Sequence, residues 1–358
     1  MSAEDKLVIP LVLESETTPG HREGRLPMTT LIDLLGHEVP SSRSGIAEEL
    51  HVVTGAFGYT GKYIARRLIA RGIKVRTLTN RPDRPSPFGD QVTAFPFNFE
   101  KPAELTKCLQ GATTVLNTYW VRFPRGNVTY DSAVENTKRL IRAAEEAGVR
   151  RFVHISIANP SVESTIPYYR GKALLETAIA QSHLSYAILR PTVIFGDEDI
   201  LINNLAYLIR HYPVFLVPGS GEYRLQPIFV QDLAELAATA ATGKDNMVVD
   251  AVGPEVYTFN ELLRLVATTV CRSCKLIHVS PWLALFTSRM IGWAINDVLL
   301  TRDEMTGLMA NLLVSSGEPI GQTRLSDWLA QHAERVGVGY ASELGRHYSG
   351  HQSSRGSI

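Results

Sequence analysis

The sequence predicts an α/β fold, with a doubly wound parallel sheet and a small C-terminal mixed α/β lobe, from three observations. A glycine-rich turn follows a short apolar run, residues 50–54, and leads into a segment with helical periodicity. Beyond it, β-branched apolar runs alternate with amphipathic segments as far as residue 189. The 358 residues suffice for one large domain, or for one domain with a smaller lobe. Alternating strands and helices form parallel sheets covered on both faces.

The first βαβ unit contains the glycine-rich turn. Gly55, Gly58 and Gly61 lie three residues apart, before a helix that stops at Gly72 and a second strand, Lys74 to Thr79. In such turns the first glycine permits a tight bend, the second lets the backbone approach a pyrophosphate, and the third lets the helix lie close to the sheet. The free N–H groups of the helix then face the anion, which predicts a dinucleotide site. The predicted contacts within this loop also include Phe57, Tyr59 and Thr60.

The later segments repeat the alternation. The expected strands are residues 91–97, 113–118, 151–157 and 185–189, and the expected helices are 102–110, 131–147 and 168–181. Ligands of such sheets bind at the carboxyl ends of the strands, where the strand order reverses.

The end of the second strand favours NADP(H) over NAD(H). NAD-binding units usually place Asp or Glu there to hold the ribose hydroxyls. This chain has Thr79, Asn80 and Arg81 instead, so no carboxylate repels a 2′-phosphate and the guanidinium can pair with it. Asn80 and Arg81 are therefore assigned to the cofactor site, with NAD as the alternative cofactor.

The candidate catalytic residues are Tyr168 and Lys172. They are four residues apart, so on a helix both side chains face the same way. A tyrosine phenol has a pKa near 10, and a nearby ammonium together with the charge of a nicotinamide favours the phenolate. Tyr168 can then act as general acid/base while hydride moves to or from the nicotinamide.

These motifs resemble the short-chain dehydrogenase/reductase superfamily, in its extended and atypical branches. The resemblance runs from Leu50 to Asp232 and includes the GxxGxxG turn, the YxxxK pair and the segment LRPTVIFG at residues 189–196. The segment PVFLVPGSGEYRLQPIFVQDLAE, residues 213–235, is similar to the group that includes the reductase-like accessory subunit of respiratory complex I.

The resemblance implies further site residues. In the family the lysine of YxxxK also binds the nicotinamide ribose, and a Ser or Thr at the end of the preceding strand binds the substrate oxygen. Here Ser156 is a candidate for that hydroxyl, while Ile157 and Ala158 stand where relatives most often keep it. The following loop offers two other hydroxyls, those of Ser161 and Ser164. The implied cofactor contacts are Asn98 and Phe99 near the adenine, Asn117 near the ribose, and Pro191 and Val193 along the nicotinamide carboxamide.

The expected organisation has four parts. They are an N-terminal extension, partly disordered (1–48), a Rossmann domain (49–241), a lobe that covers the substrate (242–346), and a flexible tail (347–358). Within the lobe we expect the apolar stretch Trp282 to Leu300 to form helices over the pocket. Such stretches are more often core than lipid-facing, although a protein partner or a membrane surface contacting this lobe is a second expectation.

The leading functional hypothesis is an NADP-dependent oxidoreductase acting on a small-molecule substrate. One alternative is a non-catalytic nucleotide-binding accessory or sensor protein, and another is a nucleotide-sugar epimerase or dehydratase. Lysine plus arginine and aspartate plus glutamate both number 36, which gives no reason to expect a nucleic-acid partner. No metal site is expected, because Cys271 and Cys274 form a CxxC without a second pair. No uncharged apolar run reaches the roughly 18 residues of a membrane helix, and three cysteines fit a reducing, cytoplasmic location.

Overall fold

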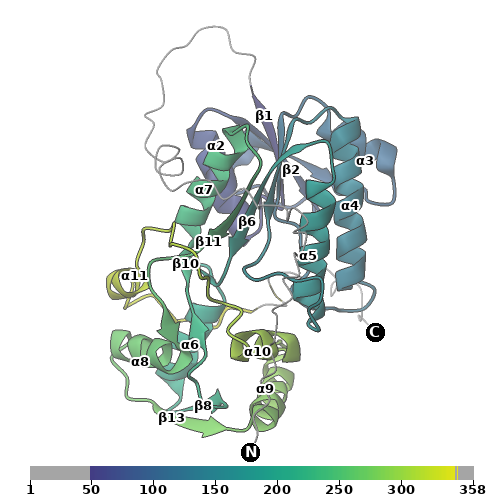
Figure 1. Cartoon of the computed structure of the whole chain (residues 1–358). Helices are drawn as coiled ribbons and strands as arrows, with labels where there is room; N and C mark the ends of the chain where they lie inside the picture. Colours follow the sequence, from purple (N-terminus) through teal and green to yellow (C-terminus); the bar gives the residue numbers. More distant parts are fainter. Residues whose placement is uncertain (1–48, 343–344, 346–358) are drawn as a thin grey trace, which may run out of the picture.

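A seven-stranded sheet forms the centre of the computed structural model, which describes residues 49–342 and residue 345 (Figure 1). Its strand order is β11-β6-β5-β4-β1-β2-β3, and every neighbouring pair is parallel. The order reverses between β1 and β4, which is where a ligand site is expected. The strands are β1 (Leu50–Thr54), β2 (Lys74–Thr79), β3 (Val92–Pro96), β4 (Thr114–Asn117), β5 (Arg151–Ile155), β6 (Ser185–Pro191) and β11 (Met247–Ala251).

Helices cover both faces of this sheet, and each face has its own apolar core. One core joins the sheet to α2 and α7, and the other joins it to α3, α4 and α5. The central strands are therefore buried on both sides, and all five residues of β5 are buried. The predicted doubly wound parallel sheet is confirmed. The helices are α2 (Tyr59–Ala70), α3 (Pro102–Leu109), α4 (Tyr130–Glu146), α5 (Pro167–Ala180) and α7 (Val230–Thr242).

A second unit with its own apolar core lies below the sheet in Figure 1. Its short paired strands are β8 with β13, and β9 with β12, while β7 pairs with β10 beside the sheet. Its helices are α6 (Leu201–His211), α8 (Phe259–Thr269), α9 (Pro281–Ile295), α10 (Arg302–Met309) and α11 (Leu325–Gln331). The short strands are β7 (Ile194–Phe195), β8 (Val214–Pro218), β9 (Arg224–Leu225), β10 (Ile228–Phe229), β12 (Tyr257–Thr258) and β13 (Lys275–Val279).

The division of the chain at residue 241 differs from the observed arrangement. The strand β11 lies beyond that residue and completes the sheet, whereas α6 and β8 precede it and pack in the second unit. The chain leaves the sheet after β6, returns through α7 and β11, and leaves again. A single cut cannot separate units that are interleaved in this way. The extension 1–48 and the tail 347–358 fall outside the described residues.

Two polar side chains, the buried Gln226 and the half-buried Asp232, join the second unit to the sheet. The Gln226 amide donates to the Gly253 carbonyl over 3.0 Å and accepts from the backbone N–H of Ser315 over 3.1 Å. The Asp232 carboxylate accepts from the backbone N–H groups of Gln322 and Thr323, both over 2.8 Å. Both residues belong to the 213–235 segment singled out in the sequence.

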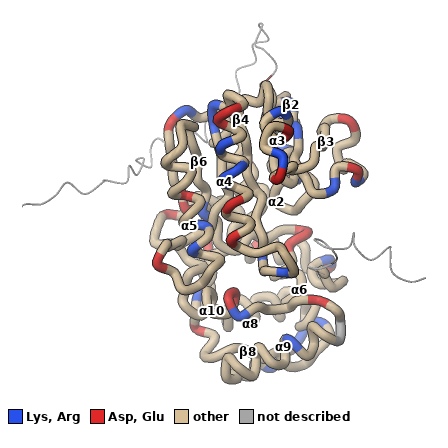
Figure 2. Tube along the Cα trace, turned by 90° about the vertical axis from the view of Figure 1, so that its right-hand side faces the viewer, with Lys and Arg blue, Asp and Glu red and all other residues tan. Residues whose placement is uncertain are grey.

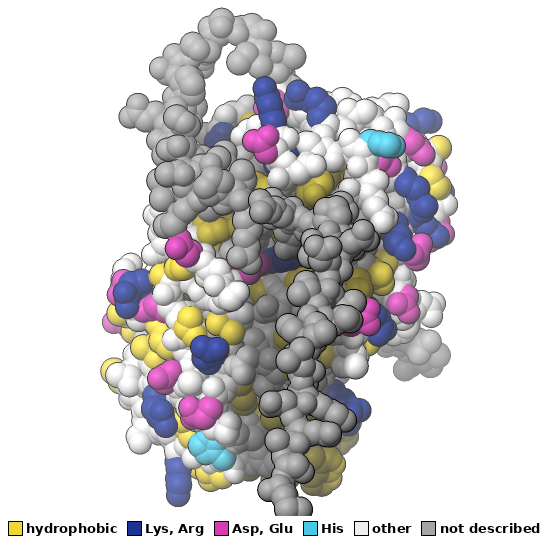
Figure 3. Space-filling view, viewed as in Figure 1, with side chains coloured by type: hydrophobic (Ala, Val, Ile, Leu, Met, Phe, Trp, Pro, Cys, Tyr) yellow, Lys and Arg dark blue, Asp and Glu magenta, His cyan; other side chains and the backbone are white. Residues whose placement is uncertain are grey.

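The apolar stretch 282–300 is helical where α9 runs, but α9 exposes most of its large apolar side chains, so the expectation that they form core is wrong. Trp282 is 71% exposed and Trp293 is 82% exposed. Hydrophobic side chains show at the lower end of the molecule in Figure 3, where Figure 1 places α9. Charges of both signs are spread over the chain (Figure 2), but α9 contains a single charged residue, Arg289. In the part of the chain that the structure describes, no helix is both long and apolar enough to cross a membrane.

Candidate functional site

The glycine-rich turn has the geometry that its spacing predicted. Gly55 has a φ of +69°, and its N–H donates to the Leu78 carbonyl over 2.8 Å, which holds the end of β1 against β2. The Gly58 N–H donates to the Gly55 carbonyl over 2.8 Å. A Cβ atom on Gly61 would stand 2.3 Å from the Gly55 carbonyl oxygen, so only glycine allows α2 to begin so close to the turn. Gly55 and Gly61 are therefore required for different steric reasons, a positive φ and a close approach of backbone.

The N-terminus of α2 lacks a side-chain cap. Its capping residue is Gly58, which has no side chain to accept a hydrogen bond from the first turn. Helix N-termini carry unsatisfied N–H groups and the positive end of the helix dipole, and both favour an anion. Within the turn, Phe57 is 9% exposed and packs in the apolar core. Tyr59 and Thr60 are half-buried, and Tyr59 meets Tyr63 edge-on with ring centroids 5.8 Å apart.

Asn80 and Arg81 lie at the carboxyl end of β2, on the same edge as the glycine turn. Asn80 is exposed and Arg81 is half-buried, with its N–H donating to the Thr79 hydroxyl over 3.2 Å. The buried Thr77 hydroxyl ties β2 to the turn, because it accepts from the Ala56 N–H over 3.0 Å.

Aromatic residues line the neighbouring strand ends. Phe99 stacks on Phe97 with centroids 4.8 Å apart, and it contacts Tyr119 at 5.0 Å. Asn98 precedes it in a left-handed conformation with φ of +50°, which asparagine tolerates well. Both Asn98 and Phe99 are half-buried.

Asn117 is fully buried, and its side chain joins three neighbouring strands. Its amide oxygen accepts from the Thr54 hydroxyl over 2.9 Å, and its amide nitrogen donates to Nδ1 of His154 over 3.0 Å. The imidazole proton is therefore on Nε2. Burial lowers the pKa of His154 far below its ordinary value, and the charge of Lys172 adds to this. Asn117 thus joins the ends of β1, β4 and β5 beneath the candidate site.

Tyr168 and Lys172 lie on the first two turns of α5, as predicted, but both contact an aromatic ring that the sequence did not indicate. The Lys172 ammonium donates to the Ile155 carbonyl over 2.7 Å and stands 4.6 Å from the centre of the Trp120 ring. The Tyr168 ring meets the same indole edge-on, with centroids 5.6 Å apart. Burial lowers the pKa of Lys172 to about 7, and the Glu176 carboxylate opposes this.

The surroundings of Tyr168 raise the pKa of its phenol. Burial is the main cause, the carboxylate of Glu304 adds to it, and Arg122 opposes it. Arg122 and Glu304 form an ion pair of 2.6 Å that links the loop after β4 to α10. The direction is opposite to the expected stabilisation of a phenolate. Spacing along α5 could not reveal this, because Glu304 comes from the second unit.

Ser156 is committed to a buried charge cluster. Its hydroxyl donates to Glu176 over 2.5 Å, and the same carboxylate accepts from the Arg190 guanidinium over 2.6 Å. Ser156 is 4% exposed. The two alternative hydroxyls, of Ser161 and Ser164, each accept from a backbone N–H two residues later in the loop. In this structure all three hydroxyls have roles in holding the chain.

The segment expected along the nicotinamide carboxamide is held by backbone bonds. The Pro191 carbonyl accepts from the Ala158 N–H over 2.8 Å, and the Val193 carbonyl accepts from the Ile228 N–H over 2.8 Å. Pro191 is buried and Val193 is half-buried.

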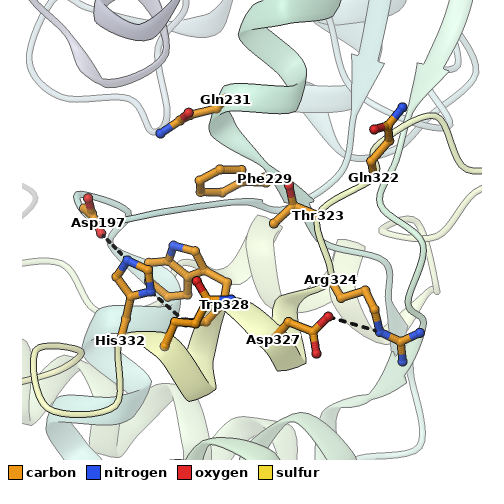
Figure 4. A pocket seen from close by; sticks show the side chains of 10 residues that line it. Asp197, Phe229, Gln231, Gln322, Thr323, Arg324, Asp327, Trp328 and His332 are labelled. Carbon is orange, nitrogen blue, oxygen red and sulfur yellow. Dashed lines mark hydrogen bonds and ion pairs between the residues drawn. The ribbon is translucent and has the colours of Figure 1, made fainter.

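A separate cavity of about 360 Å³ lies between the start of α7 and the start of α11 (Figure 4). His332 stacks on Trp328 with centroids 4.5 Å apart, and its Nε2 lies 3.6 Å from the Asp197 carboxylate. None of the sequence-predicted site residues lines this cavity.

Comparison with known proteins agrees with the fold and with the glycine turn. Residues 55–204 match a family described as NAD(P)H-binding. The chain is 26% identical over 244 residues to "NADH dehydrogenase [ubiquinone] 1 alpha subcomplex subunit 9, mitochondrial" of Arabidopsis thaliana, covering 64% of this chain and 60% of that relative. The chain therefore spans less than two thirds of the length of that relative.

Two solved structures have the same fold. One is the Citrobacter triphenylmethane reductase complexed with NADP(H), with a TM-score of 0.64 and 19% identity over 79% of this chain and 99% of that one. The other is the NADPH-dependent quinone oxidoreductase of Escherichia coli complexed with NADPH, with a TM-score of 0.64 and 20% identity over 78% of this chain and 99% of that one.

Proposed function

We propose that this chain belongs to the short-chain dehydrogenase/reductase superfamily, in its extended and atypical branches, and that it binds NADP(H) at the glycine-rich turn. The observation that carries the proposal is the geometry of the glycine-rich turn and of the N-terminus of α2. Any side chain on Gly61 would collide with the turn, and the uncapped N-terminus of α2 offers its N–H groups to a pyrophosphate. Residues of this kind fit the phosphates of a dinucleotide.

The choice of NADP(H) over NAD(H) rests on Arg81. The end of β2 has Thr79, Asn80 and Arg81 and no carboxylate, so a 2′-phosphate meets a positive charge there. Replacing Arg81 with Ala should weaken NADPH binding by about 1–3 kcal/mol and leave NADH binding nearly unchanged. Equal affinity of the wild-type protein for the two cofactors, measured by isothermal titration, would contradict the preference.

The catalytic part of the proposal assigns general acid/base chemistry to Tyr168. The nicotinamide, when bound, supplies or accepts hydride. The phenol would give a proton to the substrate oxygen or take one from it, and the buried ammonium of Lys172 would bind the ribose. This rests on the position of both residues on α5, next to the ends of β4 and β5. Ser156 contributes less, because its hydroxyl holds Glu176.

A substrate screen tests this assignment. NADPH oxidation should be followed with quinones, other carbonyl compounds and nucleotide sugars, the last class covering epimerase or dehydratase chemistry. Tyr168→Phe should abolish any turnover found and leave NADPH affinity within about threefold of the wild type. Unchanged turnover in that variant would remove the catalytic role.

A second candidate function is that of a nucleotide-binding accessory protein, favoured by the exposed apolar face of α9. Trp282, Phe286, Met290 and Trp293 are between 50% and 82% exposed, and a face of this kind is typical of an interaction site. The curated relative named above is itself called a subunit of a larger enzyme. On this view a partner protein covers α9. The double variant Trp282→Ser with Trp293→Ser should lose the complex in pull-downs from the native host and keep NADPH binding. Loss of binding to lipid vesicles instead would point to a membrane surface.

The cellular location is also a proposal. The cysteine content favours the cytoplasm, whereas the relative named above is mitochondrial. Fractionation of the native host with an antibody to the protein decides between these compartments.

A further inference from the structure

The indole of Trp120 covers the two candidate catalytic side chains. It lies in the loop directly after β4, at the edge of the sheet where ligands bind. One face of the ring meets the ammonium of Lys172 at 4.6 Å, and the ring meets Tyr168 at 5.6 Å with an interplanar angle of 84°. Lys172 is only 3% exposed. A ligand atom that reaches both side chains therefore needs space that the indole fills.

The helix α5 has a gap in its surface that accommodates this ring. A Cβ atom on Gly171 would stand 2.8 Å from Cη2 of Trp120, so any other residue at that position would push the indole away. The ring of Tyr130 also stacks on Trp120, with centroids 6.1 Å apart and an angle of 15°. The position of the indole is thus determined by packing from two elements.

Aromatic packing and the Lys172 ammonium contact the ring, but its polar atom makes no hydrogen bond within the described residues. The Trp120 Nε1 atom is buried, and it has no hydrogen-bond partner among the residues that the structure describes. A buried N–H group without a partner costs about 1–3 kcal/mol. A position where the indole could make that bond would offset part of the packing lost when the ring leaves α5.

We propose that Trp120 is a gate that limits the access of ligands to Tyr168 and Lys172. With the indole against α5, a dinucleotide can bind through the glycine-rich turn while the catalytic pair stays covered. With the indole displaced, the ammonium and the phenol become accessible to the nicotinamide half and to a substrate oxygen. This inference rests on the proposed function, since it takes the cleft beside the turn as the cofactor site.

Chemical labelling tests the gate without any substrate. The protein, wild type and variants, is treated with acetic anhydride, and acetylation of Lys172 is compared by mass spectrometry with that of the surface residue Lys138. Trp120→Ala should raise the relative acetylation of Lys172 by about tenfold or more, because the covering ring is gone. Trp120→Phe, which keeps a ring over Gly171, should raise it far less. If the larger cavity of Trp120→Ala prevents folding, Trp120→Leu serves in its place.

Turnover and cofactor binding complete the experiment. NADPH affinity in Trp120→Ala should equal or exceed that of the wild type, because the uncovered Lys172 ammonium becomes accessible to the nicotinamide ribose. NADPH oxidation with the carbonyl panel should rise by about tenfold or more and disappear when Tyr168→Phe is added. Equal acetylation of Lys172 in the wild type and Trp120→Ala, or faster Tyr168-dependent turnover in the wild type, would overturn the gate. If no variant binds NADPH, the proposed function fails, and the acetylation ratio still decides whether Trp120 covers Lys172.

Discussion

Replacing Lys172 with Met should change the pH dependence of folding stability in a defined direction. The ammonium is buried, and within the described residues it has one hydrogen bond, to the Ile155 carbonyl, together with the face of Trp120. Burial lowers the pKa of this lysine from 10.5 to about 7. The folded protein therefore disfavours the charged form, which a methionine avoids.

The sign follows from proton binding by the two states. Between about pH 7 and pH 10.5 the unfolded chain keeps the lysine proton and the folded chain releases it, so the free energy of unfolding rises with pH through this window. At about 1.4 kcal/mol for each pH unit, the full penalty below pH 7 approaches 5 kcal/mol. The methionine loses a hydrogen bond of about 1 kcal/mol. We expect Lys172→Met to be more stable than the wild type by about 2–4 kcal/mol near pH 6, and equal or slightly less stable near pH 10.

Urea unfolding at several pH values between about 6 and 10 measures this difference without added cofactor. Lys138→Met is the matched control, because that lysine is on the surface of α4 and pairs with Glu135. The control should give a curve parallel to that of the wild type. A Lys172→Met curve that also runs parallel to the wild type across the window would refute the assignment of a destabilising buried charge at this position.

Three further variants test other parts of the structure. Gly61→Ala places a Cβ 2.3 Å from a backbone oxygen and should weaken NADPH binding by about tenfold or more, whereas Gly339→Ala, which has open space around it, should not; titration of both variants decides this. Glu176→Gln removes the charge that faces Arg190 and should lower the free energy of unfolding by about 1–3 kcal/mol, a loss limited by the partial exposure of the arginine. An unchanged urea midpoint would argue against a stabilising Ser156–Glu176–Arg190 cluster. Asp232→Asn replaces the carboxylate that accepts from the N–H groups of residues 322 and 323 with a weaker, neutral acceptor, and should speed proteolytic cleavage of that loop. An unchanged cleavage rate would show that other contacts hold the loop.

The alternation of elements and the glycine turn could be predicted because both are local. Strand and helix periodicities depend on neighbouring residues, and the roles of Gly55 and Gly61 follow from a backbone path only a few residues long. The parallel sheet and the placement of Tyr168 and Lys172 on one helix followed from the same spacing. These features are confirmed as structure, while the catalytic role of the pair stays a prediction.

The tertiary structure decided what surrounds those residues. The sequence could not show that α5 brings Glu176 to the Ser156 hydroxyl, or that the Asn117 amide bonds to side chains of β1 and β5. The apolar composition of α9 does not tell whether another element covers it. Trp120 meets Lys172 only because the loop after β4 lies against α5, where Gly171 leaves room for a ring. Spacing along the chain determines which side chains share a face, but the identity of the opposing face depends on contacts between distant segments.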